Sequence, residues 1–432
     1  MNNWAITSLE GKISIKHGYP FKSEFFSDIE TSFIVLTPGN FYEEGGFKRQ
    51  VGKEKFYTGE VPEKYLHEAG DLIVAMTEQA AGLLGSCARV PESGIYLHNQ
   101  RLGLITTDPS KILKDYVYHL FKTKTVREQV RLTSSGSKVK HTSPERIYNV
   151  KIPLPSVTEQ QKIVNFLDAL ENKIDLNNRI NAELEAMAKT LYDYWFVQFD
   201  FPNENGKPYK ASGGKMVYND NLKREIPEGW SASNILSVAN LLGGGTPSKS
   251  KEEYWNGHIP FFTPSDSDNN VFSIETESYI TDLGLEKSST RLFEKNTVFI
   301  TARGSVGRLA LNSVPMAMNQ SCYALKPKNG ISFSFLFYLI KELIHHLEVK
   351  ASGSVFNSIV SNDIEFTNLA LPDDKTIIER FAEMAEPIFK RIEIATLENK
   401  QLSSQRDWLL PMLMNGQVTV KHKTASQEAQ HG

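Results

Sequence analysis

The sequence predicts an α+β protein in which two mixed domains are each followed by one long helix, as a pseudo-two-fold repeat. The first observation is an internal duplication. Ser135-Gly136-Ser137 reappears as Ser352-Gly353-Ser354, and Leu154-Pro155 reappears as Leu371-Pro372, both at an offset of 217 residues (352 minus 135, and 371 minus 154). The second is that short apolar runs broken by glycine, proline and asparagine fill both halves. The third is a long segment with apolar residues at heptad spacing after each half, and together these indicate a duplicated module.

Length and composition fit a multidomain protein and argue against several protein classes. A chain of 432 residues holds two or three domains, and 40% hydrophobic and 23% charged residues are ordinary for a globular protein. Cys87 and Cys322 stand alone in the sequence, which argues against disulfides and a cysteine zinc site. The N-terminus lacks the pattern of a secretory signal, and no apolar run approaches the roughly 18 residues that span a bilayer. We therefore expect a cytoplasmic protein without membrane contact.

The first domain is expected over residues 1–157. Its β-like runs include residues 33–36 and 71–76, and one helical stretch, residues 113–132, precedes the Ser135-Gly136-Ser137 loop. Although the chain has a net charge of −3, residues 122–140 form a basic strip opposed only by Glu128. Such a strip can supply phosphate contacts, and the alternative is a solvated helix face followed by a loop. The candidate DNA-contacting residues here are Lys122, Lys124, Arg127, Arg131, Ser135, Lys138 and Lys140.

A first long helix is expected over residues 158–198. The segment contains no glycine or proline and opens with Thr158-Glu159-Gln160-Gln161, a capping-box pattern. About 40 residues at 1.5 Å rise give a rod of roughly 60 Å. Its aromatic end, residues 192–196, is either a surface for a partner or part of a core. The seam positions alternate in steps of four and three, as in a coiled coil: Ile163, Leu167, Leu170, Ile174, Leu184, Ala188, Leu191 and Trp195.

A linker is expected over residues 199–229 and a second domain over 230–373. The run 297–301 matches the strand run 72–76, and residues 333–349 form the helix before the second Ser-Gly-Ser loop. A Gly-rich turn with two arginines, residues 301–308, follows the strand. Glycine allows close approach to a phosphate or base edge, and arginine can bind guanine with two hydrogen bonds; the alternative is a surface hairpin with incidental charges. The Ser-Gly-Ser loops can donate backbone N–H groups to phosphates. The candidates in this domain are Arg303, Ser305, Arg308, Ser352 and Ser354.

A second long helix is expected over residues 374–415, followed by a flexible tail, 416–432. Pro387 is expected to kink or break this helix. Asn181 and Asn399 occupy matching seam positions at an offset of 218 residues (399 minus 181). A lone polar residue on an apolar seam can fix register, so we predict that both set the helix register; the alternative is that both are solvated. The apolar seam positions are Phe381, Ala385, Ile388, Ile392, Ala395, Leu402, Leu409 and Leu413.

The sequence carries no motif of an enzyme. Gly213-Gly214-Lys215 lacks the first glycine of a phosphate-binding loop and is followed by Met216, where Ser or Thr would bind magnesium. Asp108-Pro109-Ser110-Lys111 lacks the second proline and the aromatic residue of an amino-methyltransferase loop. Pro372-Asp373-Asp374-Lys375 stands at a helix start, where the aspartates favour the helix dipole rather than a nuclease metal site. We therefore predict no catalytic residues, no bound metal and no bound cofactor.

Several motifs together resemble one family over essentially the whole chain. Ile152-Pro153-Leu154-Pro155 with Glu159-Gln160-Gln161-Lys162-Ile163 is similar to the entry into its central helix. Residues 206–230, ending in Ile226-Pro227-Glu228-Gly229-Trp230, are similar to its inter-domain linker. The second half adds Gly244-Gly245-Thr246-Pro247-Ser248, Tyr254-Trp255-Asn256-Gly257, Ile259-Pro260, the turn 303–307 and Asn319-Gln320. In these motifs the chain resembles the specificity subunit of type I restriction–modification systems.

This resemblance implies two target-recognition domains held apart by an antiparallel pair of long helices, each domain reading one half of a split site in double-stranded DNA. It implies two modification subunits that bind S-adenosylmethionine and methylate adenine, and restriction subunits that use ATP and magnesium for translocation and cleavage. The first domain's turn, residues 77–82, lacks the arginine of the second turn, so we expect different half-sites. The alternatives are a self-sufficient methyltransferase or nuclease with fused specificity domains, and a coiled-coil scaffold without DNA affinity.

Overall fold

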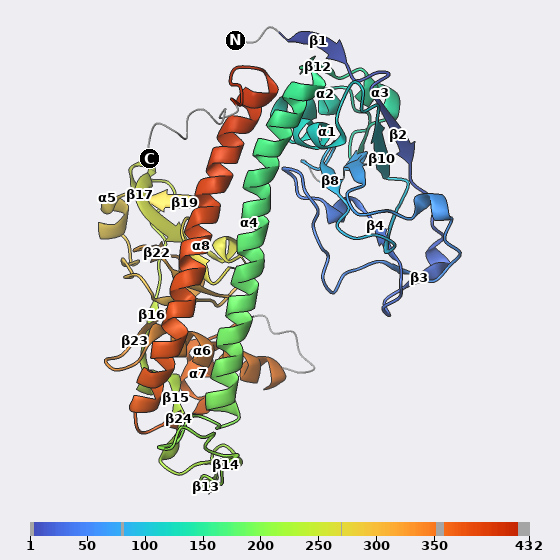
Figure 1. Ribbon diagram of the computed structural model, residues 1–432. Helices are drawn as coiled ribbons and strands as arrows, with labels where there is room; N and C mark the ends of the chain where they lie inside the picture. Colours follow the sequence, from blue (N-terminus) through green and yellow to red (C-terminus); the bar gives the residue numbers. More distant parts are fainter. Residues whose placement is uncertain (1–3, 79–81, 269, 351–357, 422–432) are drawn as a thin grey trace, which may run out of the picture. The chain divides into compact units, whose positions relative to one another are not determined.

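The computed structural model describes residues 4–78, 82–268, 270–350 and 358–421. It contains two compact units, residues 1–173 with 402–432 and residues 174–401 (Figure 1). Each unit has a mixed domain and a part of both long helices, which confirms the predicted fold class. The unit boundaries fall inside the helices rather than at their starts, where the sequence placed the domain boundaries. No helix of the described residues is long and apolar enough to span a bilayer.

The first unit is built on an antiparallel sheet with the strand order β2-β10-β6-β8. All four residues of β6 are buried, because one face packs on the helices and the other on a smaller sheet, β3-β5-β4-β9. The strands are β1 Ala5–Ser8, β2 Ile13–His17, β3 Phe26–Ser27, β4 Ile34–Leu36, β5 Phe56–Tyr57, β6 Leu72–Ala75, β7 Thr77–Glu78, β8 Cys87–Arg89, β9 Tyr96–His98, β10 Leu102–Thr107, β11 Lys140–His141 and β12 Lys151–Leu154. The short helices are α1 Lys114–Phe121, α2 Lys124–Leu132 and α3 Pro144–Tyr148.

The single helix predicted over residues 113–132 is wrong, because the chain breaks at Thr123. This residue has extended backbone angles (φ −74°, ψ 139°), and its hydroxyl donates to the carbonyl of Leu120 at 2.7 Å. A β-branched hydroxyl residue can replace a helical hydrogen bond in this way, which ends α1 and starts α2. The new helix buries Val126 and Val130.

The second unit repeats this topology. Its main sheet has the order β16-β23-β20-β21-β18, so its first four strands match β2-β10-β6-β8, and β17 pairs with β22 in parallel as β4 pairs with β9. The strands are β13 Met216–Asn219, β14 Arg224–Pro227, β15 Trp230–Asn234, β16 Ala239–Gly243, β17 Trp255–Phe262, β18 Phe272–Ser273, β19 Ser278–Ile280, β20 Val298–Thr301, β21 Leu309–Asn312, β22 Ala317–Met318, β23 Cys322–Pro327 and β24 Asn368–Pro372. The helices are α5 Asp282–Glu286, α6 Phe333–Lys350, in place of the expected 333–349, and α7 Ser361–Glu365.

A capping box marks the same place in both domains. Thr37 and Asn40 bracket the short helix η2 Pro38–Asn40, and Thr263 and Asp266 bracket η7 Pro264–Asp266, at an offset of 226 residues (263 minus 37). The backbone N–H of each threonine donates to the side chain three residues later, at 2.9 and 2.8 Å. This repeat is hard to see in the sequence because the third and fourth residues of the two boxes differ.

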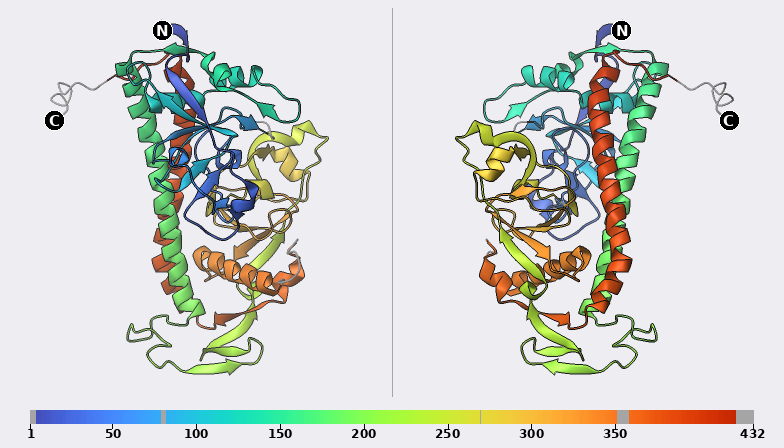
Figure 2. Two further views of the ribbon diagram at one scale, coloured as in Figure 1. Left: turned by 90° about the vertical axis from the view of Figure 1, so that its right-hand side faces the viewer. Right: turned by 90° about the vertical axis from the view of Figure 1, so that its left-hand side faces the viewer.

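The long helices are α4 Val157–Tyr192 and α8 Thr376–Met414. After α4 the chain continues into one π-helical turn, η4 Asp193–Val197. The break expected at Pro387 is absent, and Figure 2 shows α8 as a continuous helix. A proline removes one helical hydrogen bond, whereas the buried Ala385 and Phe389 on either side of it keep α8 packed on the core.

Polar side chains join α4 and α8 across their seam within the second unit. Asn177, which is 1% exposed, donates to Glu398 at 2.7 Å and to Asn399 at 2.9 Å. Asn399 in turn donates to Asn178 at 2.8 Å, and Asn181 donates to Thr396 Oγ1 at 3.3 Å. Asn181 and Asn399 therefore each form a hydrogen bond with the opposite helix, and their partners are Thr396 for the former and Asn177 and Asn178 for the latter. Their role in setting register stays a prediction, and Asn177 is the more buried member of this layer.

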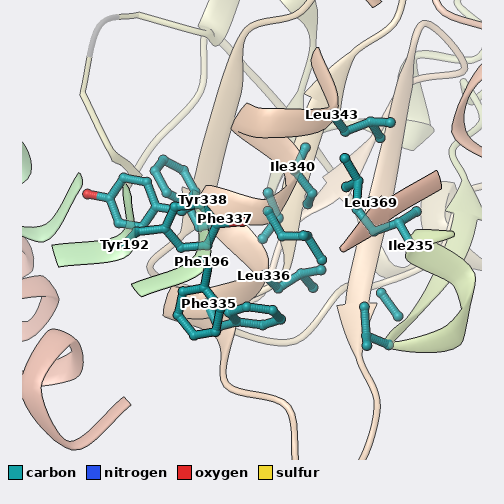
Figure 3. Close-up of a cluster of buried hydrophobic side chains, with 14 of the residues drawn as sticks. Tyr192, Phe196, Ile235, Phe335, Leu336, Phe337, Tyr338, Ile340, Leu343 and Leu369 are labelled. Atoms are coloured by element: carbon teal, nitrogen blue, oxygen red, sulfur yellow. The ribbon is translucent and has the colours of Figure 1, made fainter. Parts of the chain in front are cut away.

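The aromatic end of α4 lies in the core of the second unit. Figure 3 shows Tyr192 and Phe196 gathered against Phe335 and Tyr338 of α6. The ring centroids of Phe196 and Phe335 are 4.8 Å apart, and the Tyr192 hydroxyl donates to Glu342 at 2.7 Å. Of the two interpretations of residues 192–196, core packing is therefore correct for Tyr192, Trp195 and Phe196.

The predicted linker and tail are partly structured. Phe199 and Phe201 are buried, with ring centroids 5.2 and 5.5 Å from that of Trp230, and β13 and β14 form a hairpin. In the predicted tail, Val418 and Val420 pack against the core of the first unit, while residues 422–432 lie outside the described ranges. The apolar side chains of these segments pack in the cores and give the segments a defined structure. The polar composition of both segments hides this in the sequence.

Candidate nucleic-acid interface

We call β6 and β20 the central strands of the two domains. In each domain, the turn after the central strand lies beside the segment that returns from the Ser-Gly-Ser loop. In the first domain β7 pairs with β11, so that Glu78 is opposite Lys140 and Thr77 is opposite His141. In the second domain Arg303 and Ser358 form an isolated antiparallel β-bridge through their backbones, and the N–H of Ile359 donates to the carbonyl of Ala302 at 3.0 Å. The structure thus brings together two segments that the sequence analysis treated separately.

A closed hairpin follows α2 in the first domain. Ser135 and His141 exchange two backbone hydrogen bonds of 3.0 and 2.8 Å. Gly136 has φ 101°, and a Cβ there would lie 1.9 Å from the carbonyl oxygen of Val139, so only glycine fits. Arg146 donates to Ser135 Oγ at 2.9 Å and to the carbonyl of His141 at 3.2 Å. This bracing leaves Lys138 at the exposed tip.

Three predicted cations surround this hairpin. Arg131 and Lys138 are exposed and Lys140 is half-buried. None of the three forms an ion pair among the described residues of the first unit, so their positive charge is not neutralised within the domain. Arg146, which the sequence analysis missed, adds a fourth cation; its position five residues after the paired His141 is a signal visible only once the hairpin is known. The group is suited to phosphate contacts.

The Gly-rich turn of the second domain is built by its own hydroxyl and glycine residues. Gly304 and Gly307 have φ 84° and 83°, in the left-handed region that favours glycine. Thr301 Oγ1 accepts from the N–H of Arg308 at 3.0 Å and donates to the carbonyl of Ser305. Ser305, one of the predicted site residues, is half-buried. The side chain of Arg303 is exposed and forms no ion pair among the described residues. Ser352 and Ser354 lie outside the described ranges.

Comparison with known proteins identifies the repeated domain. The family model of the type I restriction modification DNA specificity domain matches residues 4–186 and 227–403. The chain belongs to this family. The match covers both domains and the parts of the long helices that follow them, which agrees with the duplicated topology.

Individual relatives agree with the assignment to the specificity-domain family. The chain is 28% identical over 318 residues to the type I restriction enzyme MjaIX specificity subunit of Methanocaldococcus jannaschii, covering 72% of this chain and 70% of that protein. It is 24% identical to the HindI specificity subunit of Haemophilus influenzae, with coverage of 75% and 81%. The crystal structure of the type I S subunit from M. genitalium has the same fold, with a TM-score of 0.59 over 98% of this chain and 97% of that one at 14% identity.

Within the first specificity domain, the predicted basic strip is divided. The side chain of Lys122 is 8% exposed and forms an ion pair with Glu171 of α4, which is a structural contact rather than a free charge. Arg127 donates to three backbone carbonyls and Arg308 of the second domain donates to one, so both hold loops. Lys124 is exposed at the far end of α2 and lines an apolar groove of about 530 Å³. Arg131, Ser135, Lys138 and Lys140 remain together at the hairpin.

A charge network ties α1 of the first specificity domain to α4. Asp168 Oδ1 accepts from His119 Nε2 at 2.7 Å and from Arg89 Nη2 at 2.9 Å. Burial alone would raise the pKa of Asp168, but the hydrogen bond from His119 and the charge of Arg89 outweigh it, and the pKa is lowered. His119, Asp168 and Glu171 are the one group among the described residues with metal-ligand spacing, but Arg89 and Lys122 already neutralise the two carboxylates. The network therefore fits a structural contact better than a metal site.

The two specificity domains differ at the turn after the central strand. At the positions equivalent to Arg303 and its neighbour, the first domain has Thr77 and Glu78, both buried. The Glu78 carboxylate accepts from the N–H groups of Gly82 and Leu84 at 3.0 and 2.9 Å. A buried carboxylate shapes this turn where an exposed arginine projects from the other, so the two turns present different chemistry.

Proposed function

We propose that this chain is the DNA-binding specificity subunit of a type I restriction–modification complex. Each domain would read one half of a split site through the turn after its central strand and the adjoining return segment. The observation that carries the proposal is the duplication of a specificity domain whose equivalent turns, at Thr77 and Arg303, carry different side chains. Direct readout needs such differences, because base edges in the major groove are distinguished by their donor and acceptor patterns.

The proposed partners would supply the chemistry. Two modification subunits would bind S-adenosylmethionine and methylate adenine, and restriction subunits would use ATP and magnesium for translocation and cleavage. The relatives support this assignment, since they are named as specificity subunits of restriction enzymes. A duplicated chain would offer two similar faces to two like subunits. We place the complex in the cytoplasm, where two unpaired cysteines stay reduced.

A domain exchange tests the proposal. Residues 1–173 with 402–432 are replaced by the equivalent parts of another specificity subunit, and the methylated sequence is mapped in the assembled complex. We expect one half of the recognised site to change. A change in both halves, no change, or methyl transfer by the purified chain without partners would contradict the proposal. As a control, exchange of residues 1–157 alone separates Arg89 and Lys122 from Asp168 and Glu171, and we expect a less stable protein.

The hairpin cations give a quantitative prediction. Each phosphate contact contributes about 0.9 to the slope of log K against log salt concentration. The double variant Arg131→Gln with Lys138→Gln is therefore expected to lower the magnitude of that slope by about 2, measured by titrating the assembled complex with duplex DNA. Lys114→Gln, at an exposed position on α1 away from the hairpin, is the matched control and should leave the slope unchanged.

A further inference from the structure

We propose that Arg127 and Arg308 are positioning residues for DNA recognition, one in each specificity domain. Each ties the turn after the central strand to the loop that follows the Thr-Pro capping box, and thereby fixes the turn that faces the DNA. The inference rests on the proposed function, because it assigns these turns to DNA reading. It departs from the prediction that both arginines contact DNA themselves.

In the first domain the clamp reaches in from α2. Arg127 Nε donates to the carbonyl of Leu84 at 3.0 Å, Nη2 donates to the carbonyl of Gly82, and Nη1 donates to the carbonyl of Glu43 at 2.7 Å. Gly82 and Leu84 belong to the turn between β6 and β8, whereas Glu43 lies in the loop after the box of Thr37 and Asn40. One guanidinium therefore joins the two loops.

In the second domain the clamp is part of the turn. Arg308 closes the turn between β20 and β21, and its Nη1 donates to the carbonyl of Ser267 at 2.8 Å. Ser267 is the residue directly after η7, in the loop that follows the box of Thr263 and Asp266. The two loops joined by Arg308 are thus topologically equivalent to those joined by Arg127, although the arginines come from different elements.

The acceptors indicate positioning rather than incidental contact. All are backbone carbonyls, so the bonds fix the path of the chain whatever side chains the loops carry. In Arg127 the rigid fork of N–H groups reaches three carbonyls at once, whereas Arg308, an exposed residue, holds its loop through one hydrogen bond. Burial lowers the pKa of Arg127, and no carboxylate among the described residues hydrogen-bonds its guanidinium. Burying a charged guanidinium is costly, and its hydrogen bonds to three carbonyls offset that cost only while both loops keep these positions.

The test uses Arg127→Lys and Arg308→Lys in the assembled methyltransferase complex. Lysine keeps the charge, but it lacks the planar fork with which Arg127 reaches three carbonyls and the Nη1 group with which Arg308 reaches Ser267. We expect Arg127→Lys to reduce discrimination between cognate and singly substituted sites about tenfold in the half read by the first domain and to leave the other half unchanged. Arg308→Lys should do the reverse. Arg291→Lys, at an exposed position of the second domain, is the control, for which we expect no change.

The outcomes separate this inference from the proposed function. Unchanged discrimination in a folded Arg127→Lys or Arg308→Lys complex would overturn the clamp, as would equal loosening of both halves with a lowered unfolding temperature. A wild-type complex without sequence preference would instead overturn the proposed function. If Arg127→Lys does not fold, Arg308→Lys decides. Looser discrimination in the second half-site alone supports the clamp, and unchanged discrimination in the folded complex contradicts it.

Discussion

Phe196→Ala is expected to lower the free energy of unfolding of the second unit by about 4 kcal/mol, as found for large-to-small changes at fully buried aromatic positions. The Phe196 side chain is 2% exposed. Its ring centroid lies 4.8 Å from that of Phe335, 5.3 Å from Phe381 and 6.0 Å from Trp230. It therefore joins the end of α4 to α6, α8 and β15, and its removal leaves a cavity that three elements line.

Hydrogen exchange of the full chain measures this change without requiring two-state unfolding, since a chain of two units need not unfold in one step. In Phe196→Ala the slowest amides of α6 should exchange faster, while those of β6 in the first unit stay unchanged. Tyr194→Ala, two residues away and 38% exposed, is the matched control and should have little effect. Equal protection of α6 in wild type and Phe196→Ala would contradict the prediction.

Asp168→Asn is expected to destabilise the first unit by about 2 kcal/mol at neutral pH, because it removes the negative charge that faces His119 and Arg89, while Asp115 still pairs with Arg89. The His119 side chain is 1% exposed, so water cannot make up for the weaker, uncharged acceptor. Urea unfolding of the wild type and the variant measures the difference. Asp115→Asn removes the other carboxylate of Arg89, 3.0 Å away and 45% exposed, and is expected to cost less than about 1 kcal/mol. Similar losses in the two variants would contradict the network.

The same residues predict a dependence on acid. Burial opposes ionisation of Glu171, but the charge of Lys122 outweighs it, so its pKa is lowered like that of Asp168. A carboxyl group whose folded pKa is lowered adds stability that is present above its ordinary pKa, 3.8 for Asp and 4.5 for Glu, and is lost as the pH falls through the lowered value. The first unit should thus lose stability below about pH 4.5, and Asp168→Asn should lose less over that range.

Much of the fold follows from patterns in the sequence. The duplication at Ser135 and Ser352 predicts two equal domains, and heptad spacing without glycine predicts α4 over nearly its whole length. These signals work because they repeat over tens of residues, so that single exceptions such as Pro387 do not erase them. The break at Thr123 was missed because it depends on one hydroxyl and on which face of the next helix is buried.

The candidate site was harder to predict, because composition does not reveal partners. Lys122, Arg127 and Arg131 look alike in the sequence, yet one binds Glu171, one binds three carbonyls and one is free of ion pairs among the described residues. The partner of each of these cations, or its lack of an ion pair, depends on residues more than 40 positions away that lie beside it only in the folded chain. Arg146 was missed for the same reason, since its contact with Ser135 requires the hairpin.

The separate origins of Arg127 and Arg308 have a consequence for how the two domains can diversify. In the first domain the anchoring side chain belongs to α2, so the turn can accumulate substitutions while its backbone stays held. In the second domain the anchor is the last residue of the turn itself, and every new variant of that turn must retain an arginine at position 308. We therefore expect mutation to reach new specificities more readily at one half-site than at the other, even though the two domains share one topology.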